Sequence, residues 1–168
     1  MNFDLNNRSK LNVESTPWNF NSDGDAEVLE KNMIEMMNQH HGIGLAANQI
    51  GIDKRVFVMG SDHPDFPDPF GVFNPRIINI SDETTLGEEG CLSFPAVWLK
   101  VKRPESIDVE YQDSKGNTHY KSFSGYIARC FLHEYDHLNG VCFVDRVSPL
   151  KLQLAMKKMR KILNDRTK

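Results

Sequence analysis

The segment HEYDH, residues 133–137, most constrains what this chain can fold into. Histidines four positions apart lie one turn above each other on a helix, with β-carbons about 5–6 Å apart, so both imidazoles can bind one ion. Glu134 is rotated by about 100° from His133, which takes it out of the ligand set but leaves it able to reach a water on that ion. The pattern predicts a metal-dependent hydrolase; the alternative is an amphipathic helix with two exposed or hydrogen-bonded histidines.

A third protein ligand has to come from elsewhere in the chain, because two are too few for such a site. Position 143, where one class of metalloprotease has a further histidine, is Phe143, and no glutamate follows Glu134 to act as ligand in a second class. Asp145 is one candidate. Cys91 is favoured over it, because it lies beside a glycine in GEEGCLSFP and because a thiolate suits zinc or ferrous iron alongside imidazoles.

The other two cysteines have different interpretations. Cys130 is one turn before His133 but about 10 Å along the helix axis from His137, so one ion is not expected to bind all three side chains. Cys142 is flanked by hydrophobic residues and is predicted to lie in the core. Three cysteines in 168 residues do not indicate a disulfide framework, so we expect reduced thiols and a cytosol-like compartment.

Hydrophobic patterning predicts a single α+β domain over residues 1–168. The chain is 39% hydrophobic and 26% charged, contains no apolar run of membrane-spanning length, and begins without the apolar core of a secretory signal. Helical periodicity occurs at 25–42 and 124–140 and in a C-terminal segment of about 148–164, with Ser124 and Ser148 as caps and Gly42 and Gly140 as terminating residues. Strand-like runs occur at 55–59, 73–80, 97–104, 106–112 and 118–123, with a turn at 113–117; without a strand-helix rhythm they favour α+β.

The C-terminal segment carries most of the positive charge. The chain has a net charge of −3, and residues 151–168 have seven basic residues and one acidic, a local +6, so the remainder is −9. A negative body argues against duplex nucleic acid as the main substrate. The segment has a partial apolar stripe and is interpreted as a solvated helix packed on the domain; the stripe comprises Leu150, Leu154, Met156, Met159 and Leu163.

Three separated motifs resemble, in order, the signature motifs of peptide deformylase: GIGLAANQ (42–49), EGCLS (89–93) and HEYDH (133–137), in a match spanning about residues 42–147. The resemblance implies antiparallel strands around the histidine-bearing helix. It also implies hydrolysis of the N-formyl group from the initiator formyl-methionine of nascent polypeptides, with release of formate. The implied cofactor is one divalent ion, Fe²⁺ in vivo with Zn²⁺, Ni²⁺ or Co²⁺ able to substitute, held by Cys91, His133, His137 and one water.

The resemblance also implies roles for other residues. Glu134 would take the proton of the attacking water, while the side-chain amide of Gln49 and the backbone N–H of Leu92 would stabilise the developing oxyanion. The peptide would run beside Ile43 and Gly44 as an added strand, with Gly90 facing it from the other side. The pocket for the methionine has these candidates, for each of which a core role fits equally well: Tyr126, Arg129, Cys130, Ile43 and Leu92.

Two departures from the family stand out. Leu132 occupies the position before the first histidine, where the family usually has glutamine, so we expect one hydrogen bond that supports the metal ligands to be lost. The stretch before about residue 25 lacks the usual proline-rich opening of bacterial members, which points to a divergent or virus-encoded member. The expected location is the cytoplasm, bacterial or of a host cell. The expected partners are the formyl-methionyl peptide and, through the basic C-terminal helix, ribosomal RNA; the protein is expected to be a monomer without membrane or sequence-specific nucleic-acid partners.

Three other classes compete with this prediction. The first is a zinc peptidase of the HExxH type that uses the same histidines. The second is a metal-independent cysteine hydrolase with Cys91 as nucleophile and a histidine as base. The third is a non-catalytic module with a structural ion, for which Glu134 would be dispensable.

Overall fold

The structure is a computed structural model that describes the backbone of residues 11–166 and the side chains of residues 11–162. Its helices and strands follow in the order α1 (Ala26–Gln39), β1 (Gly44–Ala46), η2 (Ala47–Ile50), β2 (Val56–Met59), β3 (Phe70–Ile80), β4 (Thr84–Cys91), β5 (Phe94–Pro104), β6 (Ser106–Gln112), β7 (Thr118–Ser124), α2 (Gly125–Leu138), η3 (Phe143–Arg146) and α3 (Pro149–Arg166). The predicted α+β class is confirmed, with antiparallel strands and a C-terminal helix.

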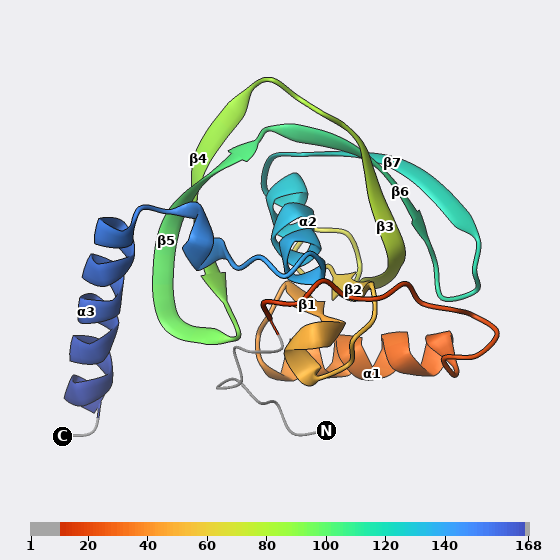
Figure 1. Cartoon of the computed structure of the whole chain (residues 1–168), viewed down its shortest axis with the longest axis horizontal. Helices are drawn as coiled ribbons and strands as arrows, with labels where there is room; N and C mark the ends of the chain where they lie inside the picture. Colours follow the sequence, from red (N-terminus) through yellow and green to blue (C-terminus); the bar gives the residue numbers. More distant parts are fainter. Residues whose placement is uncertain (1–10, 167–168) are drawn as a thin grey trace.

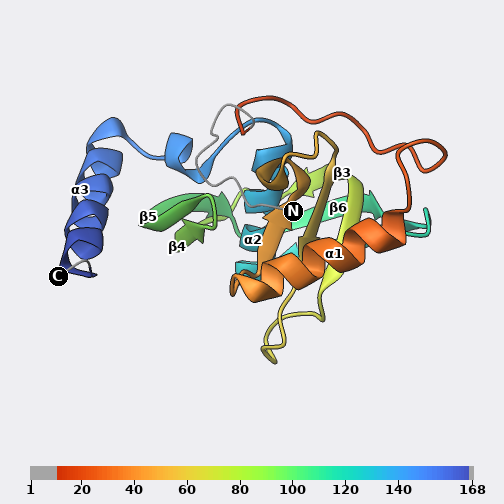
Figure 2. The same cartoon turned by 90° about the horizontal axis from the view of Figure 1, so that it is seen from below.

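In the part of the chain that the structure describes, two antiparallel sheets surround α2. One has five strands in the order β1-β2-β3-β6-β7, and the other is the β4-β5 pair. Figure 1 shows α2 between these two sheets, with α1 crossing below. In Figure 2 the same α1 crosses the five-stranded sheet. The five strands expected from the sequence are all present, but the short β1 and the strand β4 were not recognised; both are essential, since β1 borders α2 and β4 ends at Cys91.

Helix α2 is buried on nearly all sides, and half of its ten buried residues are polar or charged. Of its fourteen residues ten are buried, including Phe131 and Leu138, which are fully enclosed. Ser124 is the N-cap residue as expected, although its side chain makes no capping hydrogen bond, and Gly140 has φ +71°, the left-handed conformation that ends a helix. Such burial fixes the orientation of the side chains that α2 carries.

Helix α1 packs its methionines against the five-stranded sheet. Asp25 caps its start by accepting a hydrogen bond from the backbone N–H of Val28, and Met33 and Met37 are completely buried. The expectation that Gly42 ends the helix was wrong. The helix ends at Gln39, and the residue with positive φ is His41, at +55°.

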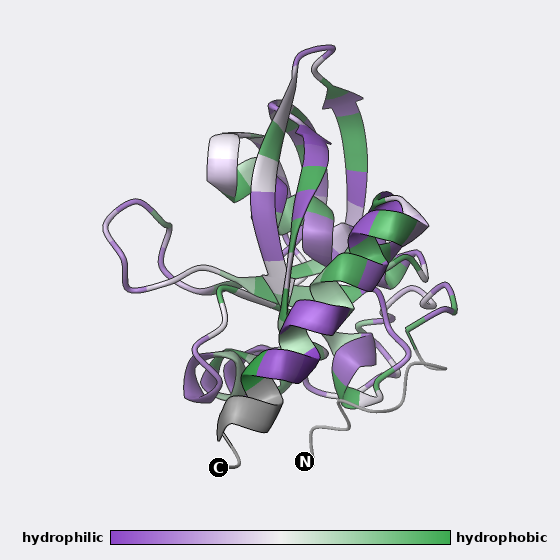
Figure 3. Ribbon diagram, turned by 90° about the vertical axis from the view of Figure 1, so that its left-hand side faces the viewer, coloured by the Kyte–Doolittle hydropathy of each residue, from purple (hydrophilic) through white to green (hydrophobic). Residues whose placement is uncertain are grey.

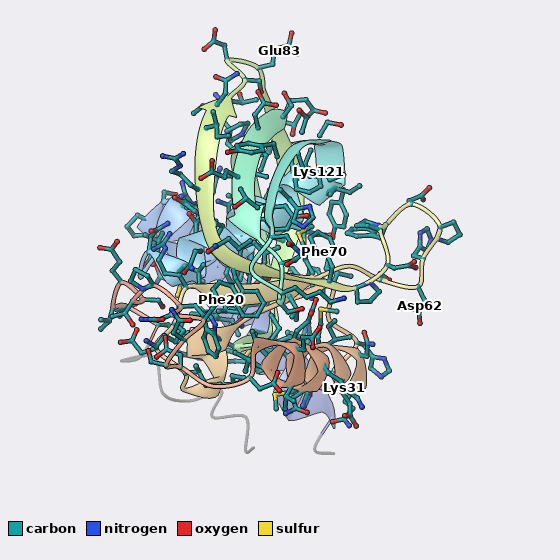
Figure 4. All side chains as sticks on the ribbon, turned by 90° about the vertical axis from the view of Figure 1, so that its right-hand side faces the viewer. Phe20, Lys31, Asp62, Phe70, Glu83 and Lys121 are labelled. Carbon is teal, nitrogen blue, oxygen red and sulfur yellow. The ribbon has the colours of Figure 1, made fainter. Side chains whose placement is uncertain are left out.

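The loop between β2 and β3, residues 60–69, contains three prolines and separates two of the predicted strands. Figure 4 shows Asp62 on this loop, well away from the body of the molecule, and Glu83 at the turn between β3 and β4. The loop packs on α2 through Phe66, whose ring meets that of Tyr126 edge to face with centroids 5.5 Å apart.

Helix α3 packs on β5 with part of its surface only. Leu152, Ala155, Met156 and Met159 join the hydrophobic cluster formed by β5 and η3. The predicted stripe was therefore partly wrong: Met156 and Met159 belong to it, whereas Leu150 and Leu154 are 65% and 60% exposed, and the side chain of Leu163 lies outside the described residues. Figure 3 shows α3 in front of the β4-β5 pair, with hydrophilic and hydrophobic segments alternating along it. Within the described part of the chain, no helix is both long and apolar enough to span a bilayer.

Candidate metal centre

The side chains of Cys91, His133 and His137 converge in the interior of the protein. One potential ligand atom from each lies within 4.8 Å of those of the other two, and the distance between Cys91 Sγ and His137 Nε2 is 3.3 Å. Cys91 is the last residue of β4, and both histidines project from α2. Asp145, the alternative third ligand, lies in η3, where its carboxylate accepts a hydrogen bond from the backbone N–H of Cys142 at 2.9 Å.

His133 is held in place by a buried carboxylate. Its Nδ1 lies 3.0 Å from Oε2 of Glu89, so a proton on Nδ1 would be shared with Glu89 and Nε2 would be left for an ion. Burial by itself would lower the pKa of His133, but contacts with Cys91 and Glu89 outweigh it and raise the pKa to about 10. A bound cation would therefore take the place of a proton at this imidazole.

His137 has a more apolar environment. It is fully buried, and its Nδ1 has no hydrogen-bond partner among the described residues. Burial, and then the proximity of His133, lower its pKa well below the ordinary value, so the ring is neutral and able to donate a lone pair. The nitrogen of His137 that faces Cys91 is Nε2, and a thiol with two imidazoles forms a donor set suited to zinc or ferrous iron.

Glu89 belongs to a buried network of charges that sequence reasoning missed. Arg103 donates to both of its oxygens at 2.9 Å, and Arg129 donates to Oε1 at 2.8 Å. Although burial favours the protonated acid, hydrogen bonds from Arg103 and His133 hold the pKa of Glu89 well below its ordinary value. The sequence pattern of β5 could have predicted that Arg103 is buried. Val97, Leu99 and Val101 are buried at every second position of the strand, and Arg103 is the next residue on the same face.

The network continues to the far side of α2. Arg103 donates to Asp136 Oδ2 at 2.5 Å, and Arg146 of η3 pairs with both oxygens of the same carboxylate. Asn48 donates from its side chain to the backbone carbonyl of His137 at 2.5 Å. Contacts of this kind hold α2 against β5, η2 and η3 and so fix the two imidazoles.

Glu134 lies beside this centre with one oxygen free. It is 4% exposed, and its Oε2 has no hydrogen-bond partner among the described residues. Burial raises the pKa of this carboxyl to about 7; Glu89 adds to the rise, while His133 and Arg103 oppose it. A β-carbon at Gly44 would lie only 2.4 Å from Glu134 Oε1, so glycine is required at this position of β1.

Gln49 is buried against the cysteine. Its Oε1 accepts a hydrogen bond from the backbone N–H of Ala46 at 2.8 Å, which orients the amide. Its Nε2 then lies 3.0 Å from Ser93 Oγ and 3.5 Å from Cys91 Sγ. The signature motifs 42–49 and 89–93 are thereby brought together at one side of the centre.

A cavity of about 470 Å³ opens beside the proposed metal ligands and Glu134. The predicted substrate-binding residues all line this cavity. Its wall includes Gln49, Cys91, Leu92, His133 and Glu134 together with Ile43, Gly44, Gly90, Tyr126, Arg129 and Cys130. His137 is not part of the wall; it lies behind it, fully enclosed.

Two residues near the cavity have roles that the sequence did not reveal. The guanidinium of Arg129 is bonded to Glu89 and to the backbone carbonyls of Thr85 and Val101 at 2.8–3.0 Å, so the aliphatic stem is the part available to a ligand. Leu132 is 7% exposed and packs in the hydrophobic cluster of α2 and the five-stranded sheet. Leu132 therefore serves core packing, and the buried carboxylate of Glu89 supplies the hydrogen bond to the metal ligands.

Comparison with known proteins identifies the family. The family described as polypeptide deformylase matches residues 5–153. Curated relatives named peptide deformylase include one from Thermotoga petrophila, 45% identical over 140 residues with 83% of each chain covered, and one from Synechocystis, 45% identical over 139 residues with 81% of this chain and 74% of the relative covered.

Solved structures agree with this assignment. A peptide deformylase from Synechococcus elongatus in complex with actinonin has a TM-score of 0.82 at 38% identity, covering 92% of this chain and 82% of the other. One from Legionella pneumophila has a TM-score of 0.83 at 33% identity, with coverage of 95% and 93%. With its fold, its convergent ligands and these relatives taken together, the chain belongs to the polypeptide deformylase family.

Proposed function

We propose that this deformylase hydrolyses the N-formyl group of formyl-methionyl peptides at the centre formed by Cys91, His133 and His137, and releases formate. The observation that carries the proposal is the buried Glu134, on the same cavity wall as Cys91 and His133, with one carboxylate oxygen that no group in residues 11–162 binds. We propose further that residues 1–168 form a single catalytic domain.

The three convergent side chains would hold one divalent ion. A thiolate with two imidazoles suits Fe²⁺, and the same donors accept Zn²⁺, Ni²⁺ or Co²⁺. When bound there, the ion would supply Lewis acidity, polarising the formyl carbonyl and lowering the pKa of a water molecule. Glu89 would keep His133 in the tautomer that offers Nε2, because it lies 3.0 Å from Nδ1.

Glu134 would move the proton. A carboxyl with a pKa near 7 can accept a proton from the attacking water and return it to the departing amine at neutral pH. Its unpartnered Oε2 is the atom available for this task. Burial prevents bulk water from competing for the proton.

The oxyanion that develops on the formyl group needs donors that are already oriented. We assign these to the side-chain Nε2 of Gln49 and the backbone N–H of Leu92. The Ala46 N–H fixes the amide of Gln49 by binding its oxygen, which leaves Nε2 directed toward Ser93 and Cys91. A neutral amide donates without pairing with Glu134.

The peptide would add to the edge of the five-stranded sheet at β1, which pairs only with β2 among the strands of the described residues. Strand β1 is an edge strand, so the backbone at Ile43 and Gly44 can bind an extended segment, which Gly90 would face from the other side. The methionine side chain would occupy the apolar part of the cavity, next to Tyr126, Cys130 and the aliphatic stem of Arg129.

The basic surface of α3 supports a further partner. Its exposed basic residues are Lys151, Lys157, Lys158, Arg160 and Lys161. We propose that this helix binds ribosomal RNA near the exit of the nascent chain, and that the enzyme acts there as a cytoplasmic monomer. Deletion of the residues after Pro149 is expected to weaken co-sedimentation with ribosomes; unchanged co-sedimentation would contradict the proposal.

The decisive experiment measures formate release from formyl-Met-Ala-Ser together with metal content, for the wild type and for Glu134→Gln. The substitution is expected to lower kcat by a factor of about 10²–10⁴, typical for loss of a general base, with metal content unchanged. A chelator should abolish activity, whereas an enzyme using Cys91 as nucleophile would remain active. Cleavage of acetylated or free peptides at an internal peptide bond would indicate a zinc peptidase instead.

A further inference from the structure

Trp98 is an unusually exposed tryptophan on the wall of the cavity. Its side chain is 61% exposed, although tryptophan is highly buried on average. The other tryptophan of the chain, Trp18, is 6% exposed in the core. An indole that remains in water beside a ligand cavity offers a large rigid surface for contact with another molecule.

Trp98 lies where the regular pairing of β5 with β4 is interrupted. Glu89 pairs with Leu99 and Cys91 pairs with Phe94, so the four residues from Pro95 to Trp98 oppose a single residue of β4. Within this excursion Ala96 has φ +61°, a strained conformation for a residue other than glycine. Irregularities of this kind reorient side chains next to active sites, and strain at such positions accompanies function.

The indole lies against the backbone of Gly90. A β-carbon on Gly90 would lie 2.9, 3.0 and 3.1 Å from Cζ3, Cη2 and Cε3 of Trp98, all atoms of the six-membered ring. Any side chain at position 90 would therefore displace the ring. Gly90 and Trp98 together form one continuous wall, and the exposed surface of the indole is open to a molecule in the cavity.

We propose that Trp98 is a specificity-determining residue that selects peptides with an aromatic side chain at the first or second position after the methionine. The inference rests on the proposed function, in which the extended peptide passes Gly90 and then leaves the cavity over the indole. Aromatic rings stack or meet edge to face on such a surface with more favourable energy than aliphatic side chains.

Charges near Trp98 argue against a cationic ligand. Lys100 and Lys102 follow at alternate positions of β5, so their side chains lie on the same face of the strand as Trp98, and both are exposed. Glu88, paired with Lys100 across the ladder, offsets one of the two charges. The remaining positive charge disfavours Lys or Arg over the indole, although these could otherwise form a cation–π contact.

The test compares formyl-Met-Phe-Ser and formyl-Met-Ala-Phe with formyl-Met-Ala-Ser, using metal-loaded enzyme. For the better aromatic peptide, kcat/KM is expected to exceed that of the reference by about three- to tenfold, mainly through KM. The ratio should fall to less than about twofold in Trp98→Ala and should persist in Trp98→Phe. A wild type without aromatic preference, or an equal preference in Trp98→Ala, would overturn the inference.

A matched control uses another exposed apolar residue. Leu86, on the adjacent β4, is 62% exposed and does not line the cavity, so Leu86→Ala should keep the wild-type ratio. Binding is observed separately through tryptophan fluorescence: the product Met-Ala-Phe should change the emission of the wild type but not that of Trp98→Phe, in which Trp18 alone remains. Inactivity on every formyl-Met peptide would refute the proposed function, whereas activity with a ratio independent of Trp98 would refute only this inference.

Discussion

The protein contains two groups of charged side chains that differ in their surroundings. Around α2, the side chains of Glu89, Arg103 and Asp136 are 4%, 2% and 7% exposed and are linked by hydrogen bonds of 2.5–2.9 Å. On β3 and β6, Arg76 and Glu110 form a pair 3.1 Å apart, with side chains 69% and 25% exposed. Both groups pair arginine with carboxylates, but only the group around α2 is buried away from water.

This difference determines what each group can do. A buried charge must be compensated by its partners, so the inner group tolerates only one arrangement and transmits that geometry to His133. A surface pair exchanges its contacts with water at little cost, so it cannot orient a neighbour. Positioning of the metal ligands therefore depends on the inner group.

The largest effect is expected from Arg103→Leu. Removal of this guanidinium leaves Glu89 and Asp136 with fewer partners in the interior, so the free energy of unfolding should fall by about 3 kcal/mol or more. Arg76→Leu, the matched surface change, should cost less than about 1 kcal/mol. Urea denaturation followed by circular dichroism measures both, and equal losses in the two variants would contradict the comparison.

An intermediate effect is expected from Glu89→Gln. The amide loses the charge that holds Nδ1 of His133, so affinity for Zn²⁺ should fall by about 10- to 100-fold, as is usual when a carboxylate behind a metal-bound histidine is removed. Competition with a chromophoric chelator measures the dissociation constant. Glu110→Gln serves as the surface control and should leave affinity unchanged; an unaffected Glu89→Gln would show that the inner group does not position the ligand.

The smallest effect concerns the turn between β6 and β7, where Asp113 lies 2.8 Å from His119. Partial burial raises the pKa of Asp113, but hydrogen bonds from His119 and Asn117 outweigh it and lower the pKa from 3.8 to about 2. Because the pKa of Asp113 is lower in the folded state than in the unfolded state, ionised Asp113 stabilises the fold. This contribution is complete above pH 3.8 and is lost as the pH falls toward 2. The difference in unfolding free energy between wild type and Asp113→Asn should shrink over this range; a difference independent of pH would be inconsistent with the shift.

Much of the site was accessible from the sequence, because its parts have local signatures. The spacing of His133 and His137 predicted a shared face, and the glycine next to Cys91 indicated a close approach; the structure brings all three together. The strands that alternate strongly were also predicted. The three residues of β1 are too few to produce a pattern, and β4 alternates only weakly because most of its residues are partly or fully exposed.

The features that the sequence did not predict depend on tertiary contacts. Nothing local to Arg129 indicates that its guanidinium crosses to carbonyls of β4 and β5, which leaves only its stem beside the cavity. Likewise, the burial of Arg103 depends on two carboxylates that are 14 and 33 residues away in sequence. Leu150 and Leu154 extended an apparent apolar stripe in α3, but the helix contacts β5 through its other face.

The cysteines differ in accessibility, and this has a practical consequence. Cys91 and Cys130 both line the cavity, but only Cys91 is partly exposed. Cys130 is buried with its thiol donating to the backbone carbonyl of Ile43 at 3.3 Å, and Cys142 is buried as well. In the native fold, therefore, a thiol-directed alkylating reagent should modify one sulfur, the one proposed to bind the ion. A bound metal would shield that sulfur, so the rate of alkylation would report directly how much of a preparation is loaded.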